Sequence, residues 1–185
     1  RCVCETVIIL SFFKNLGRDE IAKLPVLGTL TDFKLLDQNG QAFTKADLEG
    51  NIWIADFIFT TCAGPCPVMM SQFTELQDRF SNFRKLNLLS ISVYPEYDTP
   101  EVLTEYASRY DANTDRWHFL TGPEKDVKEL IKNGFKMGDF EDIIFHSERF
   151  ALVDQKGQIR GYYSGIQTDD MKNLKKDINI LLAEK

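Results

Sequence analysis

The chain has 185 residues, of which 43% are hydrophobic and 27% are charged, and its formal net charge is −6. A chain of this length can bury a sizeable core and is expected to fold as one domain. The acidic balance and the lack of a Lys/Arg stripe argue against a nucleic acid partner, and four cysteines are too few for a disulfide-framework protein.

The chain is predicted to begin with an N-terminal segment, residues 1–24, followed by the folded domain, residues 25–185. An apolar run in the segment, residues 7–13, is much shorter than the roughly 20 residues of a complete membrane span. The run is interpreted either as a short buried element or as the end of a membrane anchor. In the second interpretation Lys14 and Arg18 lie at the boundary between membrane and water.

The first part of the domain carries hairpin, strand and helix patterns. Residues 33–44 predict a β-hairpin, in which Asn39 and Gly40 supply positive φ angles to the turn. Nearly continuous apolar residues over 52–59 and 86–94 predict two strands buried on both faces, as in parallel sheets. A helix between them would complete a right-handed crossover. The apolar stripe of that helix comprises Met69, Phe73, Leu76 and Phe80.

The second part of the domain continues this alternation. A helix is predicted to start with Asp98 as its N-cap, Pro100 in its first turn and Glu101 completing a capping box. The remaining predicted elements are a short strand near 117–122, a helix over 123–134, a hairpin over 148–165 and a helix from residue 168. This order predicts an α/β fold, a central mixed sheet with helices on both faces.

The four cysteines fall into two tight pairs, Cys2/Cys4 and Cys62/Cys66, and a tight pair in a long chain is typical of catalysis or metal binding. The second pair lies between a predicted buried strand and a helix that starts with Pro67. Because a helix N-terminus stabilises an anion, these thiols are expected to be more acidic than free cysteine. The first pair is interpreted as incidental thiols, with a second metal-binding motif as the alternative.

The chain has two histidines, and one of them extends the hypothesis for the second cysteine pair. His146 precedes the second hairpin and would complete a Cys-Cys-His site with Cys62 and Cys66. Two thiolates and one imidazole suit copper, whereas the cysteines without the histidine would be a redox pair. His118 is expected to be a packed or surface residue.

One aspartate and three methionines could each have a structural or a functional role. Asp56 interrupts the predicted buried strand, so its carboxyl group has to be paired or protonated. It is interpreted as a paired core residue, with a proton acceptor for the thiols as the alternative. Met69 and Met70 are expected to pack in the core, although a thioether is a soft ligand. Met137 is the better candidate for a transient copper contact.

Three stretches, "LPVLGTLTDFKLLDQNGQAFT", "DFIFTTCAGPCPVMM" and "FHSERFALVDQKGQIRGYY", together resemble the Sco/SenC family over roughly residues 25–182. The resemblance implies a thioredoxin-like domain with an inserted hairpin. It also implies a monomer tethered by one N-terminal span, with its soluble domain on the periplasmic side or in the intermembrane space. Copper(I) or copper(II) would be bound by Cys62, Cys66 and His146. The implied role is to deliver copper to the CuA site of cytochrome c oxidase, or to reduce the thiols of that site.

Two competing functions use the same sulfurs. A thiol–disulfide oxidoreductase or redox sensor needs only Cys62 and Cys66, with Cys62 as the attacking thiol. The three residues between the cysteines count against general disulfide catalysis, which typically uses a Cys-x-x-Cys motif. A thiol peroxidase would need an arginine that the motif lacks. A copper-binding assembly factor is the leading hypothesis, with residues 134–147 as a mobile loop and a CuA-bearing subunit or another copper carrier as the partner.

Overall fold

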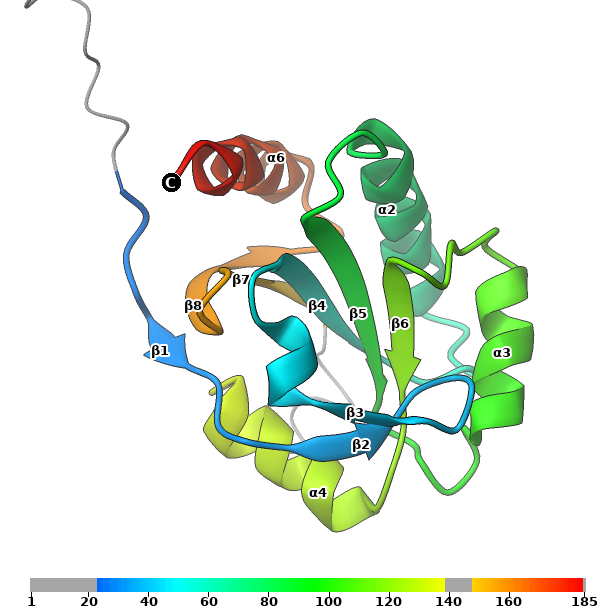
Figure 1. Cartoon of the computed structure of the whole chain (residues 1–185). Helices are drawn as coiled ribbons and strands as arrows, with labels where there is room; N and C mark the ends of the chain where they lie inside the picture. The colour runs from blue at the N-terminus through cyan, green and yellow to red at the C-terminus, as the bar shows by residue number, and fades with distance from the viewer. Residues whose placement is uncertain (1–22, 139–147, 185) are drawn as a thin grey trace, which may run out of the picture.

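The computed structural model describes residues 23–138 and 148–184 (Figure 1). In this part of the chain the central sheet is mixed and six-stranded, in the order β1-β8-β7-β4-β5-β6. Strands β4, β5 and β6, at one side of the sheet, are parallel to one another, whereas β7, β8 and β1 pair antiparallel with their neighbours. The six strands are β1 (Gly28–Thr29), β4 (Ile52–Ile58), β5 (Leu86–Ser92), β6 (Trp117–Leu120), β7 (Arg149–Val153) and β8 (Gln158–Ser164).

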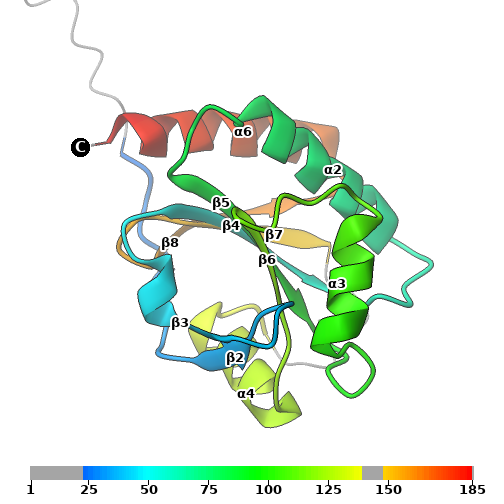
Figure 2. The same ribbon diagram turned by 45° about the vertical axis from the view of Figure 1, so that its right-hand side comes forward.

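Helices cover both faces of the sheet, which confirms the predicted fold class (Figure 2). One face is covered by α2 (Cys66–Arg79), α3 (Pro100–Ser108) and α6 (Thr168–Ala183). The other face is covered by α4 (Glu124–Glu129), its π-helical continuation η2 (Leu130–Gly134) and the small hairpin of β2 (Lys34–Leu36) and β3 (Ala42–Thr44). The 3-10 turn η1 (Lys45–Leu48) joins that hairpin to β4. Strand β1 has no counterpart among the predicted elements.

The central strand β4 is buried along its whole length, as the continuous apolar run predicted. Its side chains alternate between two cores, because successive residues of a strand point to opposite faces. Ile54 and Ile58 join the core beneath α2 and α6, whereas Trp53 and Phe57 join the core beneath α4 and the hairpin. The strand therefore runs between the two cores, and its C-terminal end leads directly into the cysteine loop.

The hairpin of β2 and β3 forms where it was predicted, but its turn differs. Gly40 has a φ of 72°, whereas Asn39 is not among the described residues with positive φ. Five residues lie between the two strands, so the turn does not need the two adjacent positive φ angles of a two-residue loop. Asp37 organises the turn instead, because its Oδ1 accepts hydrogen bonds from the backbone N–H groups of Asn39 at 2.9 Å and Gln41 at 2.8 Å.

A buried arginine holds the start of the described chain. Arg160 donates to Oδ2 of Asp154 at 2.8 Å, to Glu184 and to the carbonyl oxygens of Leu24 at 2.6 Å and Pro25 at 3.1 Å. Asp154 shapes the turn between β7 and β8, because its Oδ1 accepts two backbone N–H groups of that turn at 2.9 Å, and its Oδ2 pairs with Arg160.

Several predictions concern residues outside the described ranges. These are the apolar run 7–13 with Lys14 and Arg18, the pair Cys2/Cys4, and the division of the chain at residue 24. They stay predictions. Within residues 23–138 and 148–184, no helix is both long enough and apolar enough to cross a membrane.

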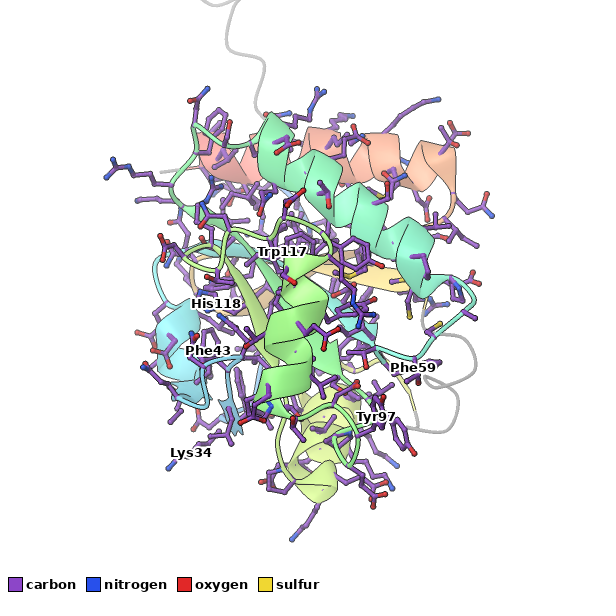
Figure 3. The ribbon with its side chains drawn as sticks, turned by 90° about the vertical axis from the view of Figure 1, so that its right-hand side faces the viewer. Lys34, Phe43, Phe59, Tyr97, Trp117 and His118 are labelled. Carbon is purple, nitrogen blue, oxygen red and sulfur yellow. The ribbon has the colours of Figure 1, made fainter. Side chains whose placement is uncertain are left out.

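His118 packs between aromatic rings, as expected. Its ring centroid lies 5.1 Å from that of Phe43 and 5.7 Å from that of Trp53. His118 and Phe43 are labelled in Figure 3. Its Nδ1 atom is buried and has no hydrogen-bond partner in the described structure. Burial lowers the pKa of His118 below its ordinary 6.5, although Asp37 and nearby carboxylates oppose this effect.

The lowered pKa of His118 predicts a loss of stability in mild acid. Below a pH of about 6.5 the unfolded chain takes up a proton that the folded chain does not, so unfolding is favoured as the pH falls. Urea titrations across this range should therefore show a steeper loss of stability in the wild-type chain than in His118→Phe. The exposed Val68→Ala, which removes no titrating group, is the control, and it should keep the wild-type slope. An unchanged slope in His118→Phe would contradict the prediction.

Candidate metal and redox site

The cysteine loop lies where β4 ends and α2 begins. The backbone N–H of Cys62 donates to the carbonyl oxygen of Phe59 at 3.0 Å, which closes a tight turn directly after the strand. Cys66 is the first residue of α2, with Pro67 in the first turn as predicted. Both cysteines are free thiols, and Cys66 is buried whereas Cys62 is only partly buried. The thiol predicted to attack is therefore the more accessible one.

The predicted acidity is wrong for Cys66. The pKa of the Cys66 thiol is raised from 9.0 to about 12, mainly by burial; the nearby Cys62 and Asp56 act in the same direction, and a backbone hydrogen bond with Phe59 opposes them. Desolvation of the thiolate thus outweighs the favourable helix N-terminus. In the metal-free protein Cys66 remains protonated at neutral pH, and it loses its proton only together with metal binding or oxidation.

Asp56 lies beneath the cysteine pair and has no exposed surface. Within the described residues neither of its carboxylate oxygens has a hydrogen-bond partner, so the interpretation as a paired core residue is wrong. Burial raises the pKa of Asp56 from 3.8 to about 7. Ser90 lies opposite in the β4–β5 register and opposes this rise, and its oxygen accepts from the indole N–H of Trp117 at 3.0 Å. Asp56 is therefore a largely protonated residue below neutral pH.

Asp98 has a different role from the predicted helix cap. Thr99 is the N-cap of α3, and its Oγ1 accepts from the backbone N–H of Val102 at 3.4 Å. The fully buried Asp98 carboxylate accepts from the backbone N–H of Thr60 at 3.2 Å, from the Thr60 hydroxyl and from the Ser92 hydroxyl at 2.6 Å. Asp and Thr are both favourable N-cap residues, so the sequence alone could not decide between Asp98 and Thr99 as the cap.

An apolar hollow adjoins the cysteine loop. It is lined by Phe59 and Thr61 from the loop and by Val93 and Tyr94 from the segment after β5. The exposed ring of Tyr94 stacks on the exposed ring of Tyr97, with centroids 6.0 Å apart and planes within 6° of parallel. The surface next to Cys62 is therefore aromatic, although no sequence pattern had pointed to it.

The remaining predicted site residues divide into three groups. Met69 and Met70 are fully buried, which confirms that they pack in the core. Met137 is partly buried against the core beneath α4. His146 and most of the loop expected to carry it lie outside the described residues. In the described ranges no three His, Cys, Asp or Glu side chains are grouped so as to hold a metal ion, so the three-ligand set stays a prediction.

A mixed sheet with helices on both faces, and paired thiols where a central strand meets a helix, defines a thioredoxin-like protein with a Cys-x-x-x-Cys centre. Residues 25–182 match the SCO1/SenC family. The chain belongs to this family, and its thioredoxin-like fold agrees with the fold of solved Sco structures.

Relatives and solved structures extend the match over most of the chain. The SCO1 protein homolog of Bacillus subtilis is 30% identical over 177 residues, covering 92% of this chain and 91% of that protein. A structure of BsSco, described as having a disulfide switch, has a TM-score of 0.76 and 29% identity, covering 88% of this chain and 99% of that one. Yeast Sco1 with copper bound has a TM-score of 0.66 and 27% identity, covering 85% of this chain and 95% of that one.

Proposed function

We propose that this protein is a copper-binding assembly factor that delivers copper to the CuA site of cytochrome c oxidase, or reduces the thiols of that site. The observation that carries the proposal is the pair of free thiols at the junction of β4 and α2, one accessible and one buried. Two related structures support it. Yeast Sco1 has been solved with copper bound, and BsSco is described as a member of the Sco family of cytochrome c oxidase assembly proteins.

Cys62, Cys66 and His146 are the proposed ligands of the transported copper. Thiolate and imidazole are suitable donors for this ion. Because Cys66 is protonated in the metal-free protein, copper binding there must release a proton, so the affinity should increase with pH. Cys62 is the more accessible thiol, and an incoming ligand of a partner protein would reach it first.

Thiol–disulfide exchange is the second candidate function, favoured by the same two reduced thiols and by the disulfide switch described for BsSco. Joining Cys62 to Cys66 releases two protons and transfers two electrons to an oxidant or to a partner disulfide. The disulfide would consume both sulfur ligands, so oxidation and copper binding would exclude one another. The two functions can therefore act in sequence on one partner.

The arrangement of the whole protein is part of the proposal. Residues 1–24 would include the end of a membrane anchor and a linker, and residues 25–185 would form the Sco domain. A monomeric domain outside the cytoplasm, in the periplasm or the intermembrane space, would place the cysteine loop near its partner. That partner is the CuA-bearing oxidase subunit or another copper carrier.

Anaerobic titration of the reduced full chain with copper(I) tests the proposal. We expect uptake of about one copper per chain, loss of this uptake in Cys62→Ser, and an affinity at least about tenfold lower in His146→Ala. His146→Ala should still form the Cys62–Cys66 disulfide. His118→Phe is the matched control, because it removes the other histidine of the chain, which packs against Phe43 and Trp53, and it should bind copper as tightly as the wild type.

Two outcomes would contradict parts of the proposal. Wild-type affinity in His146→Ala would remove the histidine from the site. No copper uptake by the reduced wild-type chain would overturn the copper function and leave the thiol–disulfide function.

A further inference from the structure

We infer that Asp98 is a positioning residue for the cysteine loop, which holds Cys62 in place relative to Cys66 through Thr60. The part of this inference that concerns copper rests on the proposed function. The part that concerns the two thiols does not, because disulfide formation between them needs no metal.

Three donors converge on the Asp98 carboxylate and link two segments. Thr60 contributes its backbone N–H, 3.2 Å from Oδ2, and its hydroxyl, which donates to Oδ1. The Ser92 hydroxyl at the end of β5 donates to Oδ2 at 2.6 Å. The backbone N–H of Asp98 donates to the carbonyl oxygen of Tyr94 at 2.9 Å, which closes the turn that carries the carboxylate. The end of β5 and the start of the cysteine loop are thus joined by one buried side chain.

The carboxylate is not needed for the helix that follows it, since Thr99 caps α3. A buried carboxylate is costly unless hydrogen bonds satisfy it, and here Thr60 and Ser92 supply those bonds. The retained charge is therefore explained by the loop that it holds rather than by the helix.

The two sulfurs are positioned by different parts of the molecule. Cys66 belongs to α2 and to the core beneath it. Cys62 lies on the loop, two residues after Thr60, where it packs against the edge of that core, and among the described residues its backbone bonds only to the tight turn that begins at Phe59. A shift of Thr60 would therefore move Cys62 while Cys66 stayed in place.

The chemistry of the pair depends strongly on such a shift. A disulfide fixes its two sulfurs at about 2.05 Å with a restricted torsion angle, and a bridging ion likewise needs both sulfurs within bonding distance. A misplacement of about 1 Å can lower the efficiency of paired groups about a hundredfold. Loosening Cys62 should therefore weaken the disulfide, and in the proposed function it should also weaken copper binding.

The test measures the copper-free dithiol–disulfide equilibrium in glutathione buffers, where the protein dithiol and oxidised glutathione give the protein disulfide and two reduced glutathione molecules. We expect Asp98→Ala and Thr60→Val to shift this equilibrium toward the dithiol, Asp98→Ala by about tenfold or more, equivalent to about 30 mV. Asp98→Asn keeps an oxygen acceptor for Thr60, so its equilibrium should lie closer to the wild-type value than that of Asp98→Ala.

Thr99→Ala is the matched control, because it removes the α3 cap next to Asp98 without removing any contact of Thr60. It should lower stability and leave the equilibrium unchanged. An equal shift in Thr99→Ala and Asp98→Ala would attribute the effect to general destabilisation and overturn the inference. If Asp98→Ala does not fold, Thr60→Val decides the matter, and an unshifted equilibrium in that variant overturns the inference. Failure of copper uptake with a shifted equilibrium would overturn only the proposed function.

Discussion

At about pH 8 the Asp56→Asn variant is expected to unfold at a higher urea concentration than the wild-type chain. The pKa of Asp56 is 3.8 in its ordinary state and about 7 when buried in the folded protein. Between these values the unfolded chain has lost a proton that the folded chain keeps, so wild-type stability falls as the pH rises. Above pH 7 this pKa difference lowers the free energy of unfolding of the wild-type chain by about 4 kcal/mol. The Asp56→Asn variant has no such proton to lose and is not destabilised in this way.

The comparison across pH separates this effect from any change in packing. At about pH 4 the wild-type side chain is protonated in the folded protein and only about half ionised in the unfolded chain, so most of the cost is absent and the two proteins should have similar stabilities. The exposed Val68→Ala, which does not change a titrating group, is the control, and its difference from the wild type should not change over the same range. A constant difference between Asp56→Asn and wild type at all pH values would show that Asp56 does not titrate as proposed.

Arg160→Ala is expected to lower the free energy of unfolding by about 3–5 kcal/mol, because it leaves the buried Asp154 carboxylate without its cationic partner. The carbonyl oxygens of Leu24 and Pro25 would lose their donor as well. Urea denaturation measures the loss of stability. Limited trypsin digestion after Lys23 should also become faster, because Arg160 no longer holds the adjacent residues Leu24 and Pro25.

An exposed ion pair provides the control for this prediction. Arg109 donates to Glu105 at 2.6 Å on the surface of α3, and such pairs contribute about 0–1 kcal/mol. Arg109→Ala should therefore have little effect on stability and none on cleavage at Lys23. If Arg160→Ala were no more destabilising than Arg109→Ala, the buried network would not stabilise the start of the domain.

Local patterns in the sequence predicted most of the fold. The continuous apolar runs of β4 and β5 and the apolar stripe of α2 show directly in the sequence which faces of these elements are buried. The small strand β1 could not be found, because its two residues gain their structure only by pairing with β8. Asp98 and Arg160 were missed as organising residues for the same reason. Their partners Thr60 and Leu24 lie 38 and 136 residues away in the chain.

The site was predicted by position more successfully than by chemistry. The strand, the Cys-x-x-x-Cys spacing and the helix start placed both thiols correctly, since the geometry at a strand–helix junction is local. The acidity of Cys66 was not predictable in this way. A helix N-terminus can be read from sequence, whereas the depth of burial that raises the Cys66 pKa to about 12 results from packing between distant elements.

The contacts of Arg160 also determine how far the thiols are from anything that precedes the domain. Arg160 and Ile52 line the same hollow, so Leu24 and Pro25 are held near the start of β4, whereas the cysteine loop follows its end. The seven residues of the strand separate these points by roughly 20 Å. The point where the described chain enters the domain therefore lies at the opposite end of β4 from Cys62. In the tethered arrangement proposed above, the thiols would be on the part of the domain away from this entry point, and the length of the tether would determine which partners they can reach.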